Sequence, residues 1–222
     1  MKRDLSLILF ILLFGLSPVP AQIPVQEEPF HQPVYQDGTM RILRVALAPG
    51  DTSLFHRHSH NIFYATLKGT RMWLEGADGL SREVTLPDGW TGADTTYAVR
   101  PFVHRIANVG RDSLVLFAVE SFRPPRSRRE ILAGDSVFYA RRHYLAAGEE
   151  IKLDIAGAVV LIVLKGRGEL RTGSQRGPHV LDGKHPWCVP EIRDGGYLRN
   201  MGNKTLILVE IRLNRPLQQS GR

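Results

Sequence analysis

The sequence contains a single cysteine, Cys188, among 222 residues, and this scarcity excludes two classes of protein. One thiol cannot form an internal disulfide framework, and it cannot supply the ligands of a cysteine-based zinc cluster. The sequence also has no Gly-x-Ser-x-Gly motif and no glycine-rich phosphate loop between a strand and a helix. We therefore expect neither a serine nucleophile of that kind nor a phosphate-binding loop.

Long apolar runs are also lacking, apart from a short one near the N-terminus. Two basic residues precede a run over 5–16 that only two non-apolar residues interrupt. A membrane-spanning helix needs roughly 20 apolar residues, so this run is too short to cross a bilayer. Val19 and Ala21 suit a cleavage site, and we predict that 1–21 is a secretory signal peptide. The protein would then be exported, to the periplasm or the extracellular space, without a stable membrane anchor. An uncleaved N-terminal anchor is the alternative.

Positive charge is in excess, with 29 Lys and Arg residues against 22 Asp and Glu residues and a formal net charge of +7. Such an excess suggests acidic partners. The only concentrated part of it lies at Arg123, Arg126, Arg128, Arg129, Arg141 and Arg142. No aromatic residues alternate with these arginines, as a stacking surface for nucleic acid requires, so we expect no nucleic-acid partner. We favour a solvated Pro/Arg linker over 123–133. Contact with acidic lipid or polysaccharide is the open alternative.

The remainder of the chain consists of short apolar or alternating runs separated by turn residues. Such runs lie at 41–47, 62–67, 113–119, 159–164 and 205–211, and Pro49-Gly50, Pro87-Asp88-Gly89 and Asp194-Gly195-Gly196 are among the turn sequences between them. No stretch has a helical period over three turns. The pattern predicts an all-β sandwich or barrel.

A weak internal repeat divides the chain into two β units. Leu67-Lys68-Gly69 recurs as Leu164-Lys165-Gly166, and the residues over 108–116 recur over 200–208. We therefore expect, in order, an extended N-terminal arm over 22–36, a first β unit over 37–122, the linker, a second β unit over 134–213 and a C-terminal tail over 214–222.

Histidines are concentrated in the first unit, at His56, His58, His60 and His104. Residues two apart on a strand point to the same face, so His56 and His58 converge, and His60 joins them if the strand continues. Neutral imidazole nitrogens held side by side suit a transition metal. A polar surface strand with alternating histidines has the same pattern, so spacing alone leaves both interpretations open.

These residues carry a resemblance to the cupin family. The first cupin motif is similar to Gly50, His56-Arg57-His58, Ile62 and Gly69, and the second to Pro101-Phe102-Val103-His104 with Asn108. The resemblance implies two cupin-type barrels, each a double-stranded β-helix or jelly roll, in a bicupin arrangement. It also implies that His56, His58 and His104 bind one divalent transition metal, and that Asn108 has a structural role.

The sequence departs from the cupin pattern at the usual glutamate ligand, where Ile62 stands. Pro101 and Val99 also replace the glycine and proline of the second motif. Three neutral imidazoles leave a divalent site at a charge of about +2, which attracts anionic or chelating ligands. His60 is the candidate for a replacement ligand. Its alternative is a side chain at the barrel mouth that never reaches the metal.

The second unit lacks these ligands. The residues over 148–155, which align with the first motif, contain no histidine, and Gly196 stands where His104 stands in the first unit. His143, His179 and His185 lie outside the aligned motif positions. We interpret the second unit as a degenerate, metal-free copy that covers an open face of the first.

Together these features favour an exported bicupin that binds one divalent metal, not distinguishable among Fe, Mn, Ni, Zn and Cu, and a small anionic molecule. If the protein is an enzyme, the resemblance implies dioxygenase-like or isomerase-like chemistry, with catalytic residues unknown. One alternative is a non-catalytic module that binds a small ligand or a sugar, and another is a structural envelope protein. Exposed strand edges would allow a homodimer.

Overall fold

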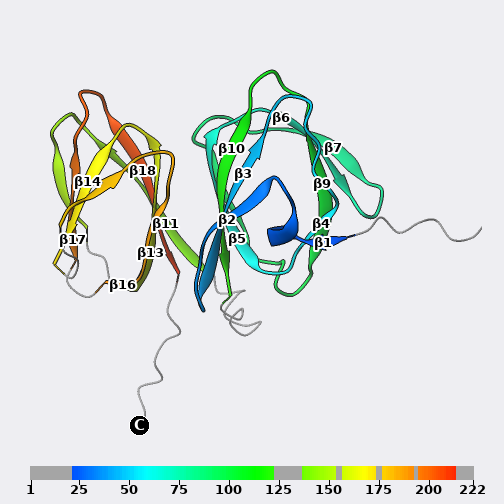
Figure 1. The fold of residues 1–222 in the computed structure, drawn as a ribbon, viewed down its shortest axis with the longest axis horizontal. Helices are drawn as coiled ribbons and strands as arrows, with labels where there is room; N and C mark the ends of the chain where they lie inside the picture. The colour runs from blue at the N-terminus through cyan, green and yellow to red at the C-terminus, as the bar shows by residue number, and fades with distance from the viewer. Residues whose placement is uncertain (1–21, 123–136, 154–156, 174–176, 193–194, 214–222) are drawn as a thin grey trace, which may run out of the picture.

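The computed structural model describes residues 22–122, 137–153, 157–173, 177–192 and 195–213. The predicted signal peptide over 1–21, linker over 123–133 and tail over 214–222 lie outside these described residues. The prediction of an all-β protein is confirmed. Apart from one short 3-10 helix, η1 (Val25–Glu27), the regular elements among the described residues are strands (Figure 1).

The first barrel consists of two facing five-stranded sheets (Figure 1). One sheet has the order β1-β4-β9-β6-β7, with bounds Ile23–Pro24, His56–His58, Phe102–Asn108, Arg71–Gly76 and Ser81–Thr85. The other has the order β2-β3-β10-β5-β8, with bounds His31–Gln36, Met40–Leu47, Leu114–Ser121, Asn61–Lys68 and Thr91–Asp94. β1 pairs parallel with β4, whereas β10 pairs antiparallel with β3 on one side and β5 on the other.

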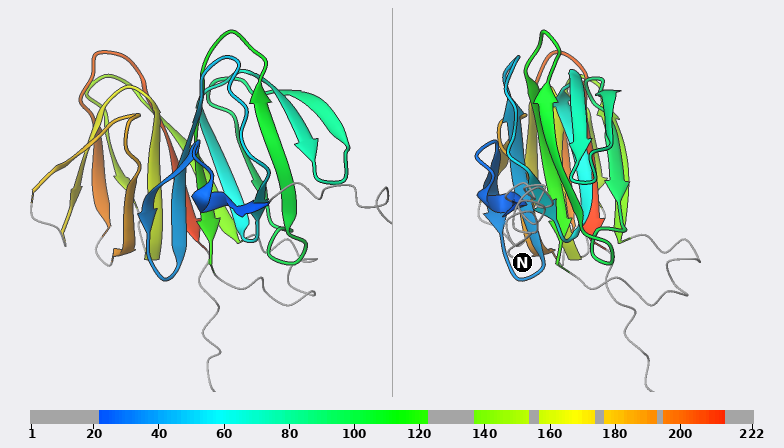
Figure 2. Two further views of the ribbon diagram at one scale, coloured as in Figure 1. Left: turned by 45° about the vertical axis from the view of Figure 1, so that its right-hand side comes forward. Right: turned by 90° about the vertical axis from the view of Figure 1, so that its right-hand side faces the viewer.

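The second barrel consists of two four-stranded sheets. One has the order β11-β18-β13-β16, with bounds Phe138–Leu145, Leu206–Leu213, Gly157–Lys165 and Trp187–Ile192. The other has the order β12-β17-β14-β15, with bounds Glu150–Leu153, Gly196–Asn200, Gly168–Thr172 and His179–Leu181. The two barrels lie side by side, as Figure 1 and the left view of Figure 2 show.

The two barrels pack against each other through a third apolar core, in addition to the core inside each barrel. This shared core joins Met40, Ile42, Phe63, Ala65, Phe117 and Val119 of the first barrel to Phe138, Ala158, Val160, Ile162, Val209, Ile211 and Leu213 of the second. Along β10, Leu116 faces the interior of the first barrel while Phe117 faces the second barrel. A strand that is buried on both faces reads as a continuous apolar run, which explains the sequence over 113–119.

The internal repeat has a structural counterpart in two buried asparagines. The Nδ2 group of Asn108 donates to the carbonyl oxygens of Leu47 and Asp112, at 3.1 and 2.9 Å. In the second barrel, the Nδ2 group of Asn200 donates to the carbonyl oxygens of Leu145 and Lys204, at 3.0 and 2.8 Å. Each amide therefore ties the end of one strand to the turn that precedes another, in the same place in both barrels.

The sequence predicted an extended arm over 22–36, but these residues are part of the first barrel. β2 pairs antiparallel with β3, and both Val25 and His31 are buried. The prolines that suggested an arm are compatible with this position, because β2 is an edge strand and its register shifts between Pro33 and Tyr35. No helix among the described residues is long and apolar enough to cross a membrane.

Candidate metal centre

The two histidines of β4 point into the first barrel. His56 and His58 are 0% and 1% exposed, whereas Arg57 between them is exposed. β9 pairs antiparallel with β4 and places His104 directly opposite His56. Because opposite residues of a strand pair project from the same face, the three imidazoles lie together.

The ring nitrogens of these three histidines are close to one another. The Nε2 atom of His104 lies 3.0 Å from Nε2 of His56 and 3.2 Å from Nε2 of His58. Nitrogens that share one ion at about 2.0–2.1 Å lie about 2.8–3.4 Å apart, for bond angles between about 90° and 109°. The observed spacing fits the donor set of a shared ion.

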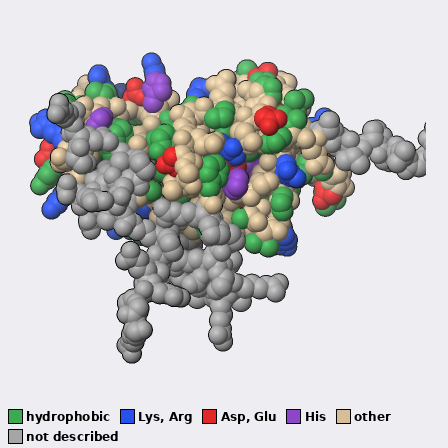
Figure 3. Space-filling model, turned by 60° about the horizontal axis from the view of Figure 1, so that its bottom comes forward, with side chains coloured by type: hydrophobic (Ala, Val, Ile, Leu, Met, Phe, Trp, Pro, Cys, Tyr) green, Lys and Arg blue, Asp and Glu red, His purple; other side chains and the backbone are tan. Residues whose placement is uncertain are grey.

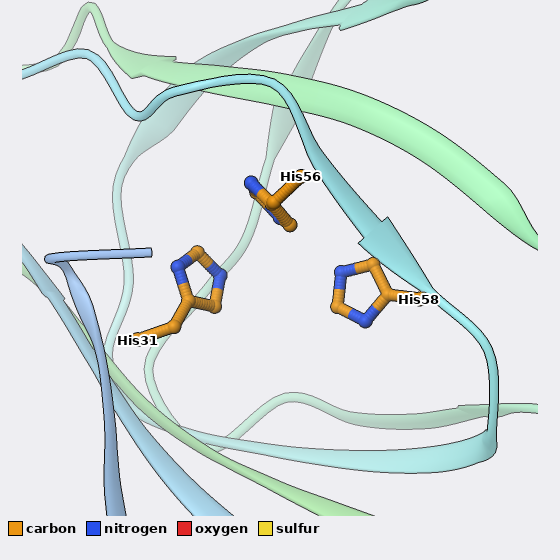
Figure 4. Close-up of side chains that lie close together, drawn as sticks. All are labelled: His31, His56 and His58. Carbon is orange, nitrogen blue, oxygen red and sulfur yellow. The ribbon is translucent and has the colours of Figure 1, made fainter. Parts of the chain in front are cut away.

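A fourth histidine, His31 of β2, joins this group. One nitrogen from each of His31, His56 and His58 lies within 4.8 Å of the other two. The ring centroid of His31 is 4.3 Å from that of His56, and the three rings face a common space (Figure 4). Sequence reasoning missed His31 because it has no histidine two residues away, and only the pairing of β2 with β3 brings it to the site.

The buried carboxylate of Glu28 contacts the Nδ1 side of the His31 ring. Oε2 of Glu28 lies 2.5 Å from Nδ1 of His31 and accepts a 2.8 Å hydrogen bond from the backbone N–H of Phe30. Oε1 accepts a 3.2 Å hydrogen bond from the backbone N–H of Leu54. Burial raises the pKa of Glu28, but the hydrogen bond and electrostatic effect of His31, together with the two backbone hydrogen bonds, outweigh it and lower the pKa below its usual value. The side chain is therefore an ionised acceptor at neutral pH.

His56 is oriented in the same way by the backbone. Its Nδ1 lies 2.9 Å from the carbonyl oxygen of Leu54. Because a carbonyl only accepts, Nδ1 carries the proton and Nε2 keeps a free electron pair that points toward His104. The Nδ1 atoms of His58 and His104 are buried and have no hydrogen-bond partner.

The environment keeps three of the imidazoles neutral. Burial, followed by the electrostatic effect of the neighbouring His31 ring, lowers the pKa of His56 to about 4. Burial also lowers the pKa values of His58 and His104 well below the usual range, and the neighbouring histidines add to both effects. Neutral imidazole is the form that binds a metal ion.

His60, the sequence candidate for a replacement ligand, lies elsewhere. Its ring packs against Phe122, with the centroids 4.8 Å apart, and it lines a separate hollow with Arg41 and Arg57. The strand β4 ends at His58, so the alternation that would have aligned His60 with the other histidines stops there. Ile62 is fully buried in the apolar core of the first barrel.

A second buried carboxylate lies opposite Ile62. Glu120 of β10 pairs with Ile62 across the sheet, so both side chains project from the same face. Oε2 of Glu120 accepts a 2.6 Å hydrogen bond from Nε of Arg41, whereas its Oε1 is buried without a hydrogen-bond partner. Burial raises the pKa of Glu120, and Arg41 opposes this effect.

A cavity of about 200 Å³ adjoins the histidines. His31, His58 and His104 form its polar wall, and side chains such as Met72, Leu86 and Ile106 form its apolar walls. In the second barrel, no comparable group of metal ligands occurs among the described residues. There His143 pairs with the buried Glu210 at 2.8 Å, and the side chain of His185 is 83% exposed.

The sequence matches no family model and no curated protein. Solved structures are similar, however. AerE from Microcystis aeruginosa covers 85% of this chain and 99% of its own, with a TM-score of 0.60 and 12% identity. A mutant of the oxalate decarboxylase OxdC from Bacillus subtilis covers 79% of this chain and 69% of its own, with a TM-score of 0.58 and 10% identity. These neighbours are cupin-family proteins.

The chain has a cupin fold. Alignments over 79% and 85% of the chain include parts of both barrels, which agrees with the bicupin arrangement implied by the two motifs. A salicylate 1,2-dioxygenase mutant from Pseudoaminobacter salicylatoxidans covers 94% of this chain and 82% of its own, with a TM-score of 0.53 and 14% identity. At such identities the similarity concerns the fold, so function has to be argued from the site.

Proposed function

We propose that the first barrel of this cupin binds one divalent transition metal through His31, His56, His58 and His104. The convergence of the Nε2 atoms of His56, His58 and His104 to 3.0 and 3.2 Å carries the proposal. His31 replaces His60 as the fourth ligand in this proposal, because one of its nitrogens lies within 4.8 Å of a nitrogen of His56 and of one of His58. One similar structure, the oxalate decarboxylase of Bacillus subtilis, is described as having Mn(II) centres.

The surroundings fit such an ion. Glu28 holds His31, and the carbonyl of Leu54 holds His56, so two of the four ligands have the outer hydrogen bond that usually orients a metal-binding histidine. When bound, a divalent ion supplies a Lewis acid and positions for a small ligand. No protein carboxylate lies among the four proposed ligands, and neutral imidazoles leave the charge of a divalent ion at about +2, which attracts an anionic ligand.

The residues around the site bear on whether the protein is an enzyme. Tyr64 and Tyr97 line the cavity. Burial is the main cause of the shifts in their pKa values: the pKa of Tyr64 is raised well above its usual value, and the pKa of Tyr97 is raised to about 12. Both hydroxyls stay protonated at neutral pH and donate hydrogen bonds, and neither acts as a base.

We propose dioxygenase-like or isomerase-like chemistry on a small anionic molecule. A non-catalytic binding module is the second candidate, favoured by the lack of an Asp or Glu among the described residues that line the cavity.

Elemental analysis of the purified protein tests the metal proposal. We expect close to one transition-metal ion per chain in the wild type and almost none in the variant His56→Ala/His104→Ala. Equal metal in the two proteins would contradict the site. The control is His143→Ala, which removes a histidine from the second barrel and is expected to leave the metal content unchanged. Incubation of the loaded protein with candidate acids then separates enzyme from binder: a dioxygenase consumes oxygen, an isomerase yields a chromatographically distinct product of the same mass, and a binder does neither.

We also propose that the protein is exported and that cleavage follows Ala21. The basic residues at positions 2 and 3 and the short apolar run over 5–16 support this proposal. N-terminal sequencing of the protein from fractionated cells should give Gln22 as the first residue, in a fraction outside the cytoplasm. A cytoplasmic protein that still begins at Met1 would contradict it.

The described surface agrees with a small-molecule partner. On the face seen in Figure 3, basic and acidic side chains of the described residues are interspersed with hydrophobic ones on both barrels. A broad single-sign patch, as nucleic acid would require, is not visible on the described part of that face. A homodimer through exposed strand edges stays a prediction, which size-exclusion chromatography tests.

A further inference from the structure

The cavity beside the histidines has two chemically different parts. Its described lining combines three imidazoles, Arg82 and three aromatic side chains with an aliphatic set, namely Val45, Met72, Leu74, Val84, Leu86, Ile106, Leu114 and Leu116. The imidazoles are buried, whereas Arg82 is exposed and also lines the adjoining surface hollow. The lining therefore combines buried ring nitrogens, apolar walls and one exposed guanidinium.

The size of the cavity limits what it can hold. An apolar cavity of about 150 Å³ accommodates a benzene molecule. The present cavity, at about 200 Å³, has room for one ring with one or two small substituents. Oxalate-sized molecules would leave much of the apolar wall uncovered.

The chemistry of the walls separates ring acids from sugars. A sugar would bury several hydroxyl groups against Leu74, Leu86 and Ile106, which have no hydrogen-bonding atoms in their side chains. Burying a hydroxyl without a partner costs about 1–3 kcal/mol. An aromatic or alicyclic ring would instead remove apolar surface from water on both sides. The wall thus favours the ring and disfavours the sugar.

The charge of the lining favours an acid. Among the described lining residues Arg82 is the only Arg or Lys, and none of them is Asp or Glu. The described lining of the cavity therefore offers a carboxylate one guanidinium and no acidic side chain, while Asp78 lines the adjoining hollow. A positive charge that lines a cleft raises the local concentration of an anion.

We propose that this site binds a compact single-ring carboxylic acid, with the carboxylate at the imidazole end and the ring between the aliphatic walls. The proposal rests on the proposed function, because the carboxylate would be held by the metal-bearing histidines. It narrows the small anionic molecule to a ring acid, and it sets the sugar-binding alternative aside.

Four probes and the metal-loaded protein test this proposal. Benzoate has the ring and the charge, acetate has only the charge, benzyl alcohol has only the ring, and glucose has neither. We expect benzoate to bind at least ten times more tightly than each of the other three, as measured by isothermal titration calorimetry. Equal affinities for benzoate and acetate would overturn the proposed ring, and tighter binding of glucose would overturn the ligand class.

Two variants locate the binding. Leu86→Trp fills the apolar part of the cavity and should weaken benzoate binding at least tenfold, and Val84→Phe at the same wall is the substitute if the first variant does not fold. Arg82→Met should weaken benzoate but not benzyl alcohol. The matched control is Arg71→Met, on the same sheet and outside the cavity, which should leave both affinities unchanged. Unaltered benzoate binding in a folded cavity-filling variant would overturn the location.

Metal content measured on the same samples separates the two proposals. Wild-type protein without metal under loading conditions contradicts the proposed function. Fully loaded protein that shows no preference for benzoate contradicts only the ligand class.

Discussion

The Nδ1 atom of His31 lies 2.5 Å from Oε2 of Glu28, and the two residues are 3% and 2% exposed. A buried ionised carboxylate in this position accepts a hydrogen bond from Nδ1, so that Nε2 is the nitrogen of His31 that is available to a metal ion. The backbone N–H groups of Phe30 and Leu54 in turn hold Glu28. This relationship joins the N-terminal segment to the histidines of β4 and β9, and it makes Glu28 a positioning residue for the proposed metal.

Replacing this carboxylate should weaken metal binding without removing a ligand. In Glu28→Gln we expect the affinity for the metal to fall by about 10–100-fold, the usual range for loss of an outer partner of a metal-binding histidine. Competition titration against a chelator measures it. Glu75→Gln, which alters a partly exposed ion pair with Arg105, is the control and should retain wild-type affinity. Identical affinity in Glu28→Gln and wild type would show that Glu28 does not position a ligand.

His60 should be dispensable for the metal. Its ring packs against Phe122 and lines a hollow outside the histidine group, so His60→Ala should bind one ion per chain with unchanged affinity. His31→Ala should lose affinity in the same titration. The reverse result, with His60 required and His31 dispensable, would refute our assignment of the fourth ligand.

The two buried asparagines should be equally important for stability. Asn108→Ala and Asn200→Ala each leave buried backbone carbonyls without their donor, and we expect each to lower the free energy of unfolding by about 2–4 kcal/mol. Chemical denaturation measures the loss. Asn203→Ala, on the turn of the second barrel at an exposed position, is the control and should change stability by less than about 0.5 kcal/mol.

The core between the barrels should contribute strongly to the stability of both. Phe117 is 1% exposed and faces the second barrel, so Phe117→Ala should cost about 3–5 kcal/mol. Hydrogen exchange should accelerate in β18 of the second barrel as well as in β10. Val99→Ala, at a position that is 64% exposed, should have no comparable effect. Faster exchange in β10 alone would mean that the barrels are stabilised independently.

Glu210 should make stability depend on pH in the acid range. Burial raises its pKa, but hydrogen bonds from His143 and Arg212 outweigh burial and lower the pKa below 4.5. An acid whose pKa is lower in the folded state stabilises the fold above the unfolded value, near pH 4.5, and loses that stabilisation as pH falls through the folded pKa. Glu210→Gln should therefore be less stable than wild type by about 2–3 kcal/mol at pH 7, and the difference should shrink below pH 4.5.

Denaturation at a series of pH values measures this difference. Glu83→Gln, whose carboxylate is about half exposed and lies 3.6 Å from Arg71, serves as the control and should follow the wild-type curve within about 0.5 kcal/mol. A constant difference between Glu210→Gln and wild type from pH 7 to pH 3 would be inconsistent with the lowered pKa.

The sequence alone was enough for the fold and for part of the candidate site. Alternation with a period of two placed His56 and His58 on one face, and the two motifs predicted two cupin-type barrels, because both signals depend on neighbours along the chain. His104 followed from the second motif. His31 could not be predicted as a site residue, because it reaches the site only through the pairing of β2 with β3. No local pattern encodes which distant strand an edge strand will join. For the same reason the prolines over 22–36 suggested an arm, although Pro33 is tolerated at an edge.

The sequence by itself therefore determined the all-β architecture, the repeat with its two asparagines and the convergence of His56 with His58. Tertiary structure decided which histidine could be the fourth ligand, since the end of β4 at His58 turns His60 toward Phe122 while β2 carries His31 inward. It also decided that Glu28 is buried behind His31 and that the space beside the imidazoles is walled by aliphatic side chains. The physical reason is that a strand's period is local, whereas burial and cavity shape arise from contacts between strands that are far apart in the sequence.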